Sequence, residues 1–136
     1  MNETTALRIG TLVLIDDEEM DHLLYRRTVE RSGLVDELIT FLSAEEALEF
    51  LRSDDRPEID AILLDINMPR MNGFEFLDAA EREIGHGFAQ MVVIMLTTSL
   101  NPEDRARADA CSMIKDYLSK PLCAEHLEKI ARMLRT

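Results

Sequence analysis

The chain has 136 residues, a length that fits one domain with a single sizeable core. Fifteen basic and twenty-seven acidic residues give a formal charge of −12, which argues against nucleic acid or an anionic membrane as a direct partner. The sequence shows no signal peptide, and its longest unbroken apolar run, residues 91–96, is far too short to span a bilayer. We therefore expect a soluble, cytoplasmic domain.

Five apolar runs alternate with five segments of helical periodicity. The strands are expected at residues 11–15, 38–41, 62–64, 92–96 and 116–118. The helices are expected between Glu18 and Gly33, after Ser43, from Gly73, from Pro102 to about Ala110, and through Leu127, Ile130 and Leu134. This alternation predicts an α/β fold with a doubly wound, five-stranded parallel sheet and helices on both faces. The strand orders 3-2-1-4-5 and 2-1-3-4-5 are both common, and periodicity does not choose between them.

Some segments carry more specific expectations. The first helix is indicated by Met20, Leu23 and Leu24 at helical spacing. Glycines in residues 85–87 predict a loop after the third helix. The helix from Pro102 offers only alanines as an apolar face, so we expect it to be weakly anchored. The three histidines show no metal-ligand spacing and are expected on the solvated surface: His22, His86 and His126.

Polar side chains follow four of the five expected strands at the point where each strand ends. Asp16 and Asp17 follow the first strand, Asp65 the third, Thr97 the fourth and Lys120 the fifth. The carboxyl ends of parallel strands share one edge, where ligands of open α/β sheets bind, so we expect these side chains to converge. Neighbouring carboxylates repel one another, and a hard cation such as Mg²⁺ removes that repulsion. The lysine and the threonine suit a phosphoryl group, with Asp65 as the nucleophile.

A family resemblance supports this interpretation. Residues 65–73, Asp-Ile-Asn-Met-Pro-Arg-Met-Asn-Gly, resemble the D-x-x-M-P-x-M-x-G signature of response-regulator receiver domains. The resemblance extends to residues 15–18, 96–99 and 117–122 and covers the chain from Leu12 to Leu134. It implies the flavodoxin-like order 2-1-3-4-5, of which a chemotaxis receiver is a known example. It also implies a short arm at residues 1–8, a receiver domain at 9–136 and no output domain.

The resemblance implies a role for each residue of the site. Asp65 would accept a phosphoryl group, and Thr97 and Lys120 would contact that group. The metal, Mg²⁺ with Mn²⁺ as a substitute, would be held by Asp16, Asp17, Asp65 and the backbone carbonyl of Asn67. Tyr117 would be an aromatic switch that turns inward when Thr97 moves, and the Lys120–Pro121 peptide would be cis. Taken alone, each residue also has an ordinary role, such as helix capping for Asp16 and Asp17 or core packing for Tyr117.

The implied partners are a sensor histidine kinase, a histidine phosphotransfer protein, or both. Signalling would follow from protein docking, phosphorelay or phosphate-sink action, and a homodimer through the fourth helix, fifth strand and fifth helix remains open. The domain would catalyse only its own phosphorylation and dephosphorylation. One departure from the family pattern is Met113-Ile114, where most receivers carry Gly-Ala before the switch aromatic.

Two other functions use related residues. A haloacid-dehalogenase-like phosphatase is a Mg²⁺-dependent phosphohydrolase that also forms an aspartyl phosphate. That class normally has a second Asp, two residues after the nucleophile, as the general acid. This chain has Asn67 at that position. An amide cannot donate or accept the proton as a carboxylic acid would. A pseudo-receiver that serves only as a scaffold is the other alternative, and the presence of Asp65, Thr97 and Lys120 argues against it.

Overall fold

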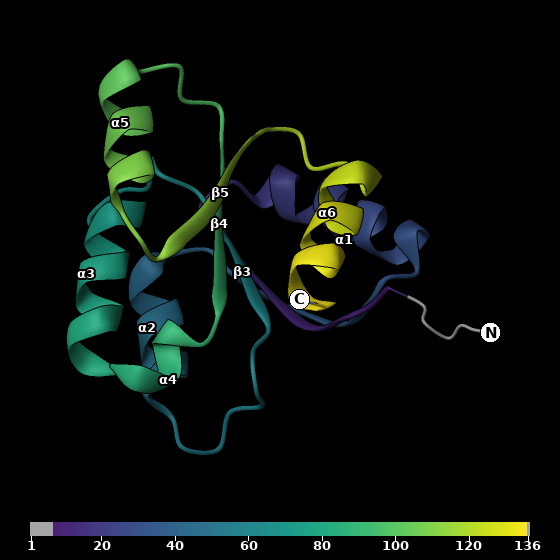
Figure 1. The fold of residues 1–136 in the computed structure, drawn as a ribbon, viewed down its shortest axis with the longest axis horizontal. Helices are drawn as coiled ribbons and strands as arrows, with labels where there is room; N and C mark the ends of the chain where they lie inside the picture. Colours follow the sequence, from purple (N-terminus) through teal and green to yellow (C-terminus); the bar gives the residue numbers. More distant parts are fainter. Residues whose placement is uncertain (1–6, 136) are drawn as a thin grey trace.

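The computed structural model describes residues 7–135 and contains one five-stranded parallel sheet (Figure 1). The strand order is β2-β1-β3-β4-β5, which confirms the order implied by the resemblance. The strands are β1 Ile9–Ile15, β2 Val35–Phe41, β3 Ala61–Leu64, β4 Val92–Thr97 and β5 Ile114–Ser119. The helices are α1 Glu19–Ser32, α2 Ala44–Arg52, α3 Gly73–Glu83, α4 His86–Ala89, α5 Pro102–Ala110 and α6 Ala124–Arg135. Most of the expected arm, residues 1–6, lies outside the described part of the chain.

The sheet separates two apolar cores, as the ribbon in Figure 1 shows with α1 and α6 on one side and α2 to α5 on the other. Side chains of a strand point alternately to the two faces. In β1, Leu12 and Leu14 therefore join the core under α1 and α6, whereas Val13 and Ile15 join the core under the other helices. All four residues of β3 are buried, as expected for a central parallel strand. Within residues 7–135, no helix is long and apolar enough to cross a membrane.

Local sequence signals explain how several helices begin. Ser43 accepts a hydrogen bond from the Glu46 N–H at the start of α2. Asn72 forms a capping box with Glu75 at the start of α3, so backbone N–H groups that the helix leaves unpaired are satisfied. Asn101 caps α5 in a similar way, with Pro102 at its first position.

The apolar residues that indicated α1 in the sequence are not the residues that this helix buries. Met20, Leu23 and Leu24 are exposed by 63%, 53% and 49%, whereas Tyr25 and Val29 are the buried residues of this helix. The apolar residues at positions 20, 23 and 24 fit a helical spacing. The side of the helix that packs against α6 and the sheet is the adjacent one, which carries residues 25 and 29. Periodicity identified the helix and not the side that it buries.

Two further local features differ from the expectation. The segment expected as a loop at residues 85–87 includes the start of α4, a single helical turn anchored by the buried Phe88. The ladder between β4 and β5 is irregular, because Val93 pairs with Ile114 whereas the next residue, Ile94, pairs with Asp116. This irregularity lies directly after Met113, at the place where the sequence departs from the family pattern. The weak anchoring expected for α5 is confirmed, since Ala108 alone of its nine residues is buried.

Candidate functional site

The polar residues predicted at the strand ends do meet at the carboxyl edge of the sheet. Backbone hydrogen bonds fix their register: the Asp65 N–H donates to the Ile15 carbonyl at 3.0 Å, and the Lys120 N–H donates to the Thr97 carbonyl at 3.0 Å. Asp16 follows Ile15 directly, so the first and third strands deliver their carboxylates side by side. The Lys120–Pro121 peptide is cis, as the resemblance implied.

Three carboxylates form the acidic centre of this edge. Oxygen atoms of Asp16, Asp17 and Asp65 all lie within 4.8 Å of one another. Burial raises the pKa of Asp16 to about 6, although Lys120 opposes the shift, and burial also raises the pKa of Asp65. Carboxylate oxygens at this spacing are the donor set that a hard divalent cation prefers, and such a cation would compensate both the burial and the mutual repulsion. The acidic centre therefore fits Mg²⁺.

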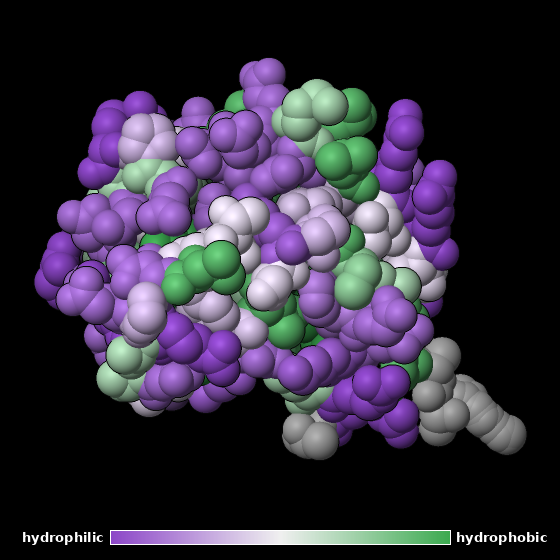
Figure 2. Space-filling view, turned by 90° about the horizontal axis from the view of Figure 1, so that it is seen from above, coloured by the Kyte–Doolittle hydropathy of each residue, from purple (hydrophilic) through white to green (hydrophobic). Residues whose placement is uncertain are grey.

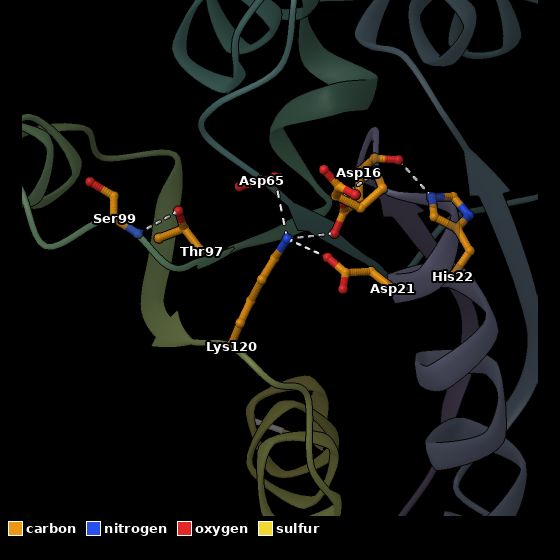
Figure 3. Close-up of polar contacts among 8 residues, drawn as sticks. Asp16, Asp21, His22, Asp65, Thr97, Ser99 and Lys120 are labelled. Atoms are coloured by element: carbon orange, nitrogen blue, oxygen red, sulfur yellow. Dashed lines mark hydrogen bonds and ion pairs between the residues drawn. The ribbon is translucent and has the colours of Figure 1, made fainter.

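Lys120 is the cationic partner of this centre (Figure 3). Its ammonium group donates to Asp16 Oδ2 at 2.7 Å, to Asp21 Oδ2 at 2.7 Å and to Asp65 Oδ2 at 3.3 Å. The lysine side chain is only 9% exposed, so solvent screens these contacts weakly. Burial would lower the pKa of Lys120, but the surrounding carboxylates outweigh burial and raise it, which keeps the ammonium group charged.

An open cavity of about 490 Å³ lies in front of these groups. It is lined by Asp17, Glu18, Asp21, Tyr25, Asp65, Asn67, Thr98, Lys120 and Pro121. The loops after β4 and β5 lie at the top of Figure 1, and Figure 2 looks down on this end of the molecule. The surface there is mostly hydrophilic, with small apolar areas separated by polar ones. Such an opening suits a small charged group better than an apolar ligand.

Sequence reasoning missed two residues of this edge. Asp21 contacts Lys120 from the first turn of α1, where the sequence shows only the acidic residues that commonly begin a helix. His22, expected on the solvated surface, is partly buried, and its Nε2–H donates to the Asp16 carbonyl oxygen at 2.6 Å. This contact holds the backbone of the acidic centre against α1.

Thr97 connects the site to the segment that follows β4. Its side chain is buried, and its hydroxyl oxygen accepts a hydrogen bond from the Ser99 N–H at 3.1 Å. The Ser99 hydroxyl donates to Asp104 of α5 at 2.7 Å, and the Tyr117 hydroxyl donates to the Ser99 carbonyl at 3.4 Å. The guanidinium carbon of Arg105 lies 4.9 Å from the centre of the Tyr117 ring. Ser99 is therefore the link between Thr97, Tyr117 and α5.

Known proteins share both the sequence pattern and the fold. Residues 12–132 match the family model described as the response regulator receiver domain. The sensor histidine kinase CheAY of Helicobacter pylori is 31% identical over 121 residues, 89% of this chain but only 14% of that protein. A two-component response regulator from Cytophaga hutchinsonii has a TM-score of 0.83 and 29% identity, over 94% of this chain and 98% of the other. Chemotaxis protein CheY4 of Vibrio cholerae has a TM-score of 0.72 and 28% identity, over 93% and 98%. The chain belongs to the family of response regulator receiver domains.

Proposed function

We propose that the chain is a phosphoacceptor that receives a phosphoryl group on Asp65 from the phosphohistidine of a histidine kinase or a histidine phosphotransfer protein. The observation that carries this proposal is the position of the Asp65 carboxylate. It lies on the cavity wall, 3.3 Å from the Lys120 ammonium and within 4.8 Å of the oxygens of Asp16 and Asp17. A carboxylate nucleophile next to both a cation and a metal-binding acid pair is what phosphoryl transfer to a carboxylate requires.

The transfer step balances with this set of residues. A carboxylate oxygen of Asp65 forms a bond to phosphorus while the bond from phosphorus to the imidazole nitrogen of the donor breaks. The electron pair of that bond returns to the imidazole nitrogen, which takes up a proton from solvent. The product is an acyl phosphate on Asp65, and the Lys120 ammonium neutralises part of the charge on the new oxygens.

Asp16 and Asp17, together with Asp65 and the Asn67 carbonyl, are the residues proposed to hold Mg²⁺. The bound cation would neutralise negative charge on the transferring oxygens. Asn67 is exposed and lines the cavity next to Asp65, which supports its inclusion. The residues themselves position the acceptor: the backbone of Asp65 is fixed in the sheet, and the Lys120 ammonium donates to its carboxylate.

The proposed output is a changed affinity of the surface formed by α5, β5 and α6 for a protein partner or a second copy of the chain. Ser99 supports this, because it bonds both to Thr97 in the site and to Asp104 of α5. Movement of the Thr97 hydroxyl toward the phosphoryl group would break the first bond and release the segment. α5 is suited to respond, since weakly packed elements move at the lowest free energy.

The test is adduct formation with beryllofluoride or acetyl phosphate in the presence of Mg²⁺, followed by intact mass and fluorine NMR. We expect one adduct per chain for the wild type and none for Asp65→Asn. Asp78→Asn, which removes an exposed carboxylate of α3, is the matched control and should behave like the wild type. An adduct on Asp65→Asn, or none on the wild type, would overturn the proposal. Sustained turnover of p-nitrophenyl phosphate would instead indicate a phosphohydrolase.

A further inference from the structure

Asp21 is the member of the site for which the proposed phosphoacceptor function gives no role. It comes from the first turn of α1, whereas the other acidic residues follow strands. Its carboxylate accepts a hydrogen bond from Lys120 at 2.7 Å, as short as the bond from Lys120 to Asp16 and shorter than the 3.3 Å contact with Asp65. Figure 3 shows the lysine ammonium ending between these three carboxylates.

A lysine ammonium has only three N–H donors. The three carboxylates around Lys120 engage all of them. A phosphoryl group on Asp65 replaces the contact between Lys120 and that carboxylate. Any further bond from the ammonium group to the phosphoryl oxygens requires Asp16 or Asp21 to give way. The question is which carboxylate releases Lys120 at the lowest free energy.

Burial answers this question. The side chain of Asp16 is 1% exposed and that of Asp65 is 9% exposed, whereas the side chain of Asp21 is 22% exposed. A carboxylate that loses its partner must be rehydrated, and this is least unfavourable for the most accessible group. Asp21 also lies outside the acidic centre of Asp16, Asp17 and Asp65, so its release leaves the metal-binding oxygens in place.

We propose that Asp21 is a positioning residue that holds Lys120 before phosphorylation and gives it up to the phosphoryl group. This inference rests on the proposed phosphorylation of Asp65. The bond between Asp21 and Lys120 competes with the bonds that the phosphoryl oxygens need from the same ammonium group, and the negative charge of Asp21 also repels these oxygens. Asp21 therefore opposes the adduct and favours its loss. Although burial works against ionisation, the hydrogen bond from Lys120 lowers the pKa of Asp21.

The experiment compares the beryllofluoride affinity of four proteins at saturating Mg²⁺, measured by fluorine NMR. These are the wild type, Asp21→Asn, Asp21→Glu and Glu19→Gln. Glu19→Gln removes one charge from the same helical turn at an exposed position, so it controls for net charge and for the helix dipole. We expect Asp21→Asn to bind beryllofluoride about tenfold more tightly than the wild type. This factor corresponds to the low end of the range of free energies for a hydrogen bond to a charged group. Asp21→Glu, which keeps the charge, should stay close to the wild type, and Glu19→Gln should change little.

A second measurement separates positioning from a structural effect on α1. The Asp21→Asn change is repeated in a Lys120→Gln background, where there is no ammonium group to hold, and the gain should disappear. A direct readout is the ¹⁵N–¹H resonance of the Lys120 ammonium, which should shift in metal-free Asp21→Asn and not in Glu19→Gln. Equal affinities of Asp21→Asn and the wild type, or a gain that persists without Lys120, would overturn this inference alone. A wild type that forms no adduct at all would overturn the proposed function as well.

Discussion

Gly73 lies against the backbone of Asp65, so closely that a Cβ on this glycine would stand 2.5 Å from the Asp65 carbonyl oxygen and 3.2 Å from the Ile66 Cα. The Gly73 N–H also donates to the Ile66 carbonyl at 2.9 Å. The start of α3 is thus packed directly on the chain that carries the proposed phosphoacceptor. The single glycine of the 65–73 signature is required for this contact, because the neighbouring atoms are backbone and cannot rotate away.

The first prediction is that Gly73→Ala lowers both stability and adduct formation. The added methyl group must push α3 or the Asp65 backbone aside, at about 1–3 kcal/mol of unfolding free energy measured by urea denaturation. A displaced carboxylate should also form the acetyl phosphate adduct about tenfold more slowly. Gly87→Ala is the control, since its Cβ would meet nothing closer than 3.8 Å. If Gly73→Ala matched this control in both measurements, the contact would have no consequence.

The second prediction concerns metal binding and stability. Mg²⁺ should raise the free energy of unfolding, because it relieves repulsion among carboxylates that exists only in the folded chain. A single Mg²⁺ site contributes about 2.7 kcal/mol when the free Mg²⁺ concentration is about a hundred times the dissociation constant of the site. Thermal unfolding with and without MgCl₂, against NaCl at the same ionic strength, measures the effect. Asp17→Asn removes one carboxylate of the group and should lose most of the gain. An equal gain from NaCl would indicate screening of the net charge rather than a metal site.

The third prediction separates adduct formation from its readout. Thr97→Val keeps the shape of the side chain and removes the oxygen that accepts from the Ser99 N–H. We expect the variant to form the beryllofluoride adduct, since Asp65 is unchanged, but to lose the response of α5. Hydrogen exchange of the α5 amides with and without beryllofluoride reports that response. Thr28→Val makes the same change in α1, outside the residues that line the cavity, and should respond like the wild type. A full response from Thr97→Val would show that the hydroxyl does not connect the site to α5.

The fourth prediction is a pH dependence that arises away from the site. Partial burial lowers the pKa of His126, whose Nδ1 accepts a hydrogen bond from the Cys123 N–H. The unfolded chain then binds this proton more readily than the folded chain. The contribution of His126 to stability is complete above about pH 6.5, the ordinary histidine pKa, and is lost as the pH falls below it.

The measurement is the urea unfolding free energy at about pH 7.5 and about pH 5.5, on either side of the ordinary histidine pKa. His126→Asn keeps an acceptor for the Cys123 N–H but does not titrate, so its loss of stability between the two pH values should be smaller than that of the wild type. His86→Gln, at an exposed histidine, serves as the control and should match the wild type. Equal losses in wild type and His126→Asn would contradict the prediction.

Much of the fold and the centre of the site could be predicted because both depend on short-range rules. Apolar runs that end in Asp16, Asp65 and Lys120 indicated parallel strands, and parallel strands bring their ends to one edge. The strand order needed the family resemblance, since hydrophobic periodicity is the same for either order. The caps at Ser43 and Asn72 were visible in the sequence because they are bonds between residues three positions apart.

The errors concern packing between elements, which periodicity does not contain. Leu23 and Leu24 have the spacing of a buried face, yet the side of α1 that is buried depends on where α6 and the sheet lie. The contacts of Asp21 and His22 with the site depend on the same placement of α1. The turn of α4 was missed because Gly87 within it is a poor helix former, and the burial of Phe88 outweighs that preference.

The position of β3 between β1 and β4 has one more consequence. The strand that carries Asp65 at its end is enclosed on both faces and bonded on both sides, so its backbone is the least free to shift when the charge at its end changes. If the proposed output surface is correct, a response to phosphorylation of Asp65 has to cross one further strand, β4, before it reaches the edge strand β5 and α5. The rigid sheet would then set the distance between the proposed phosphoacceptor and the surface that responds.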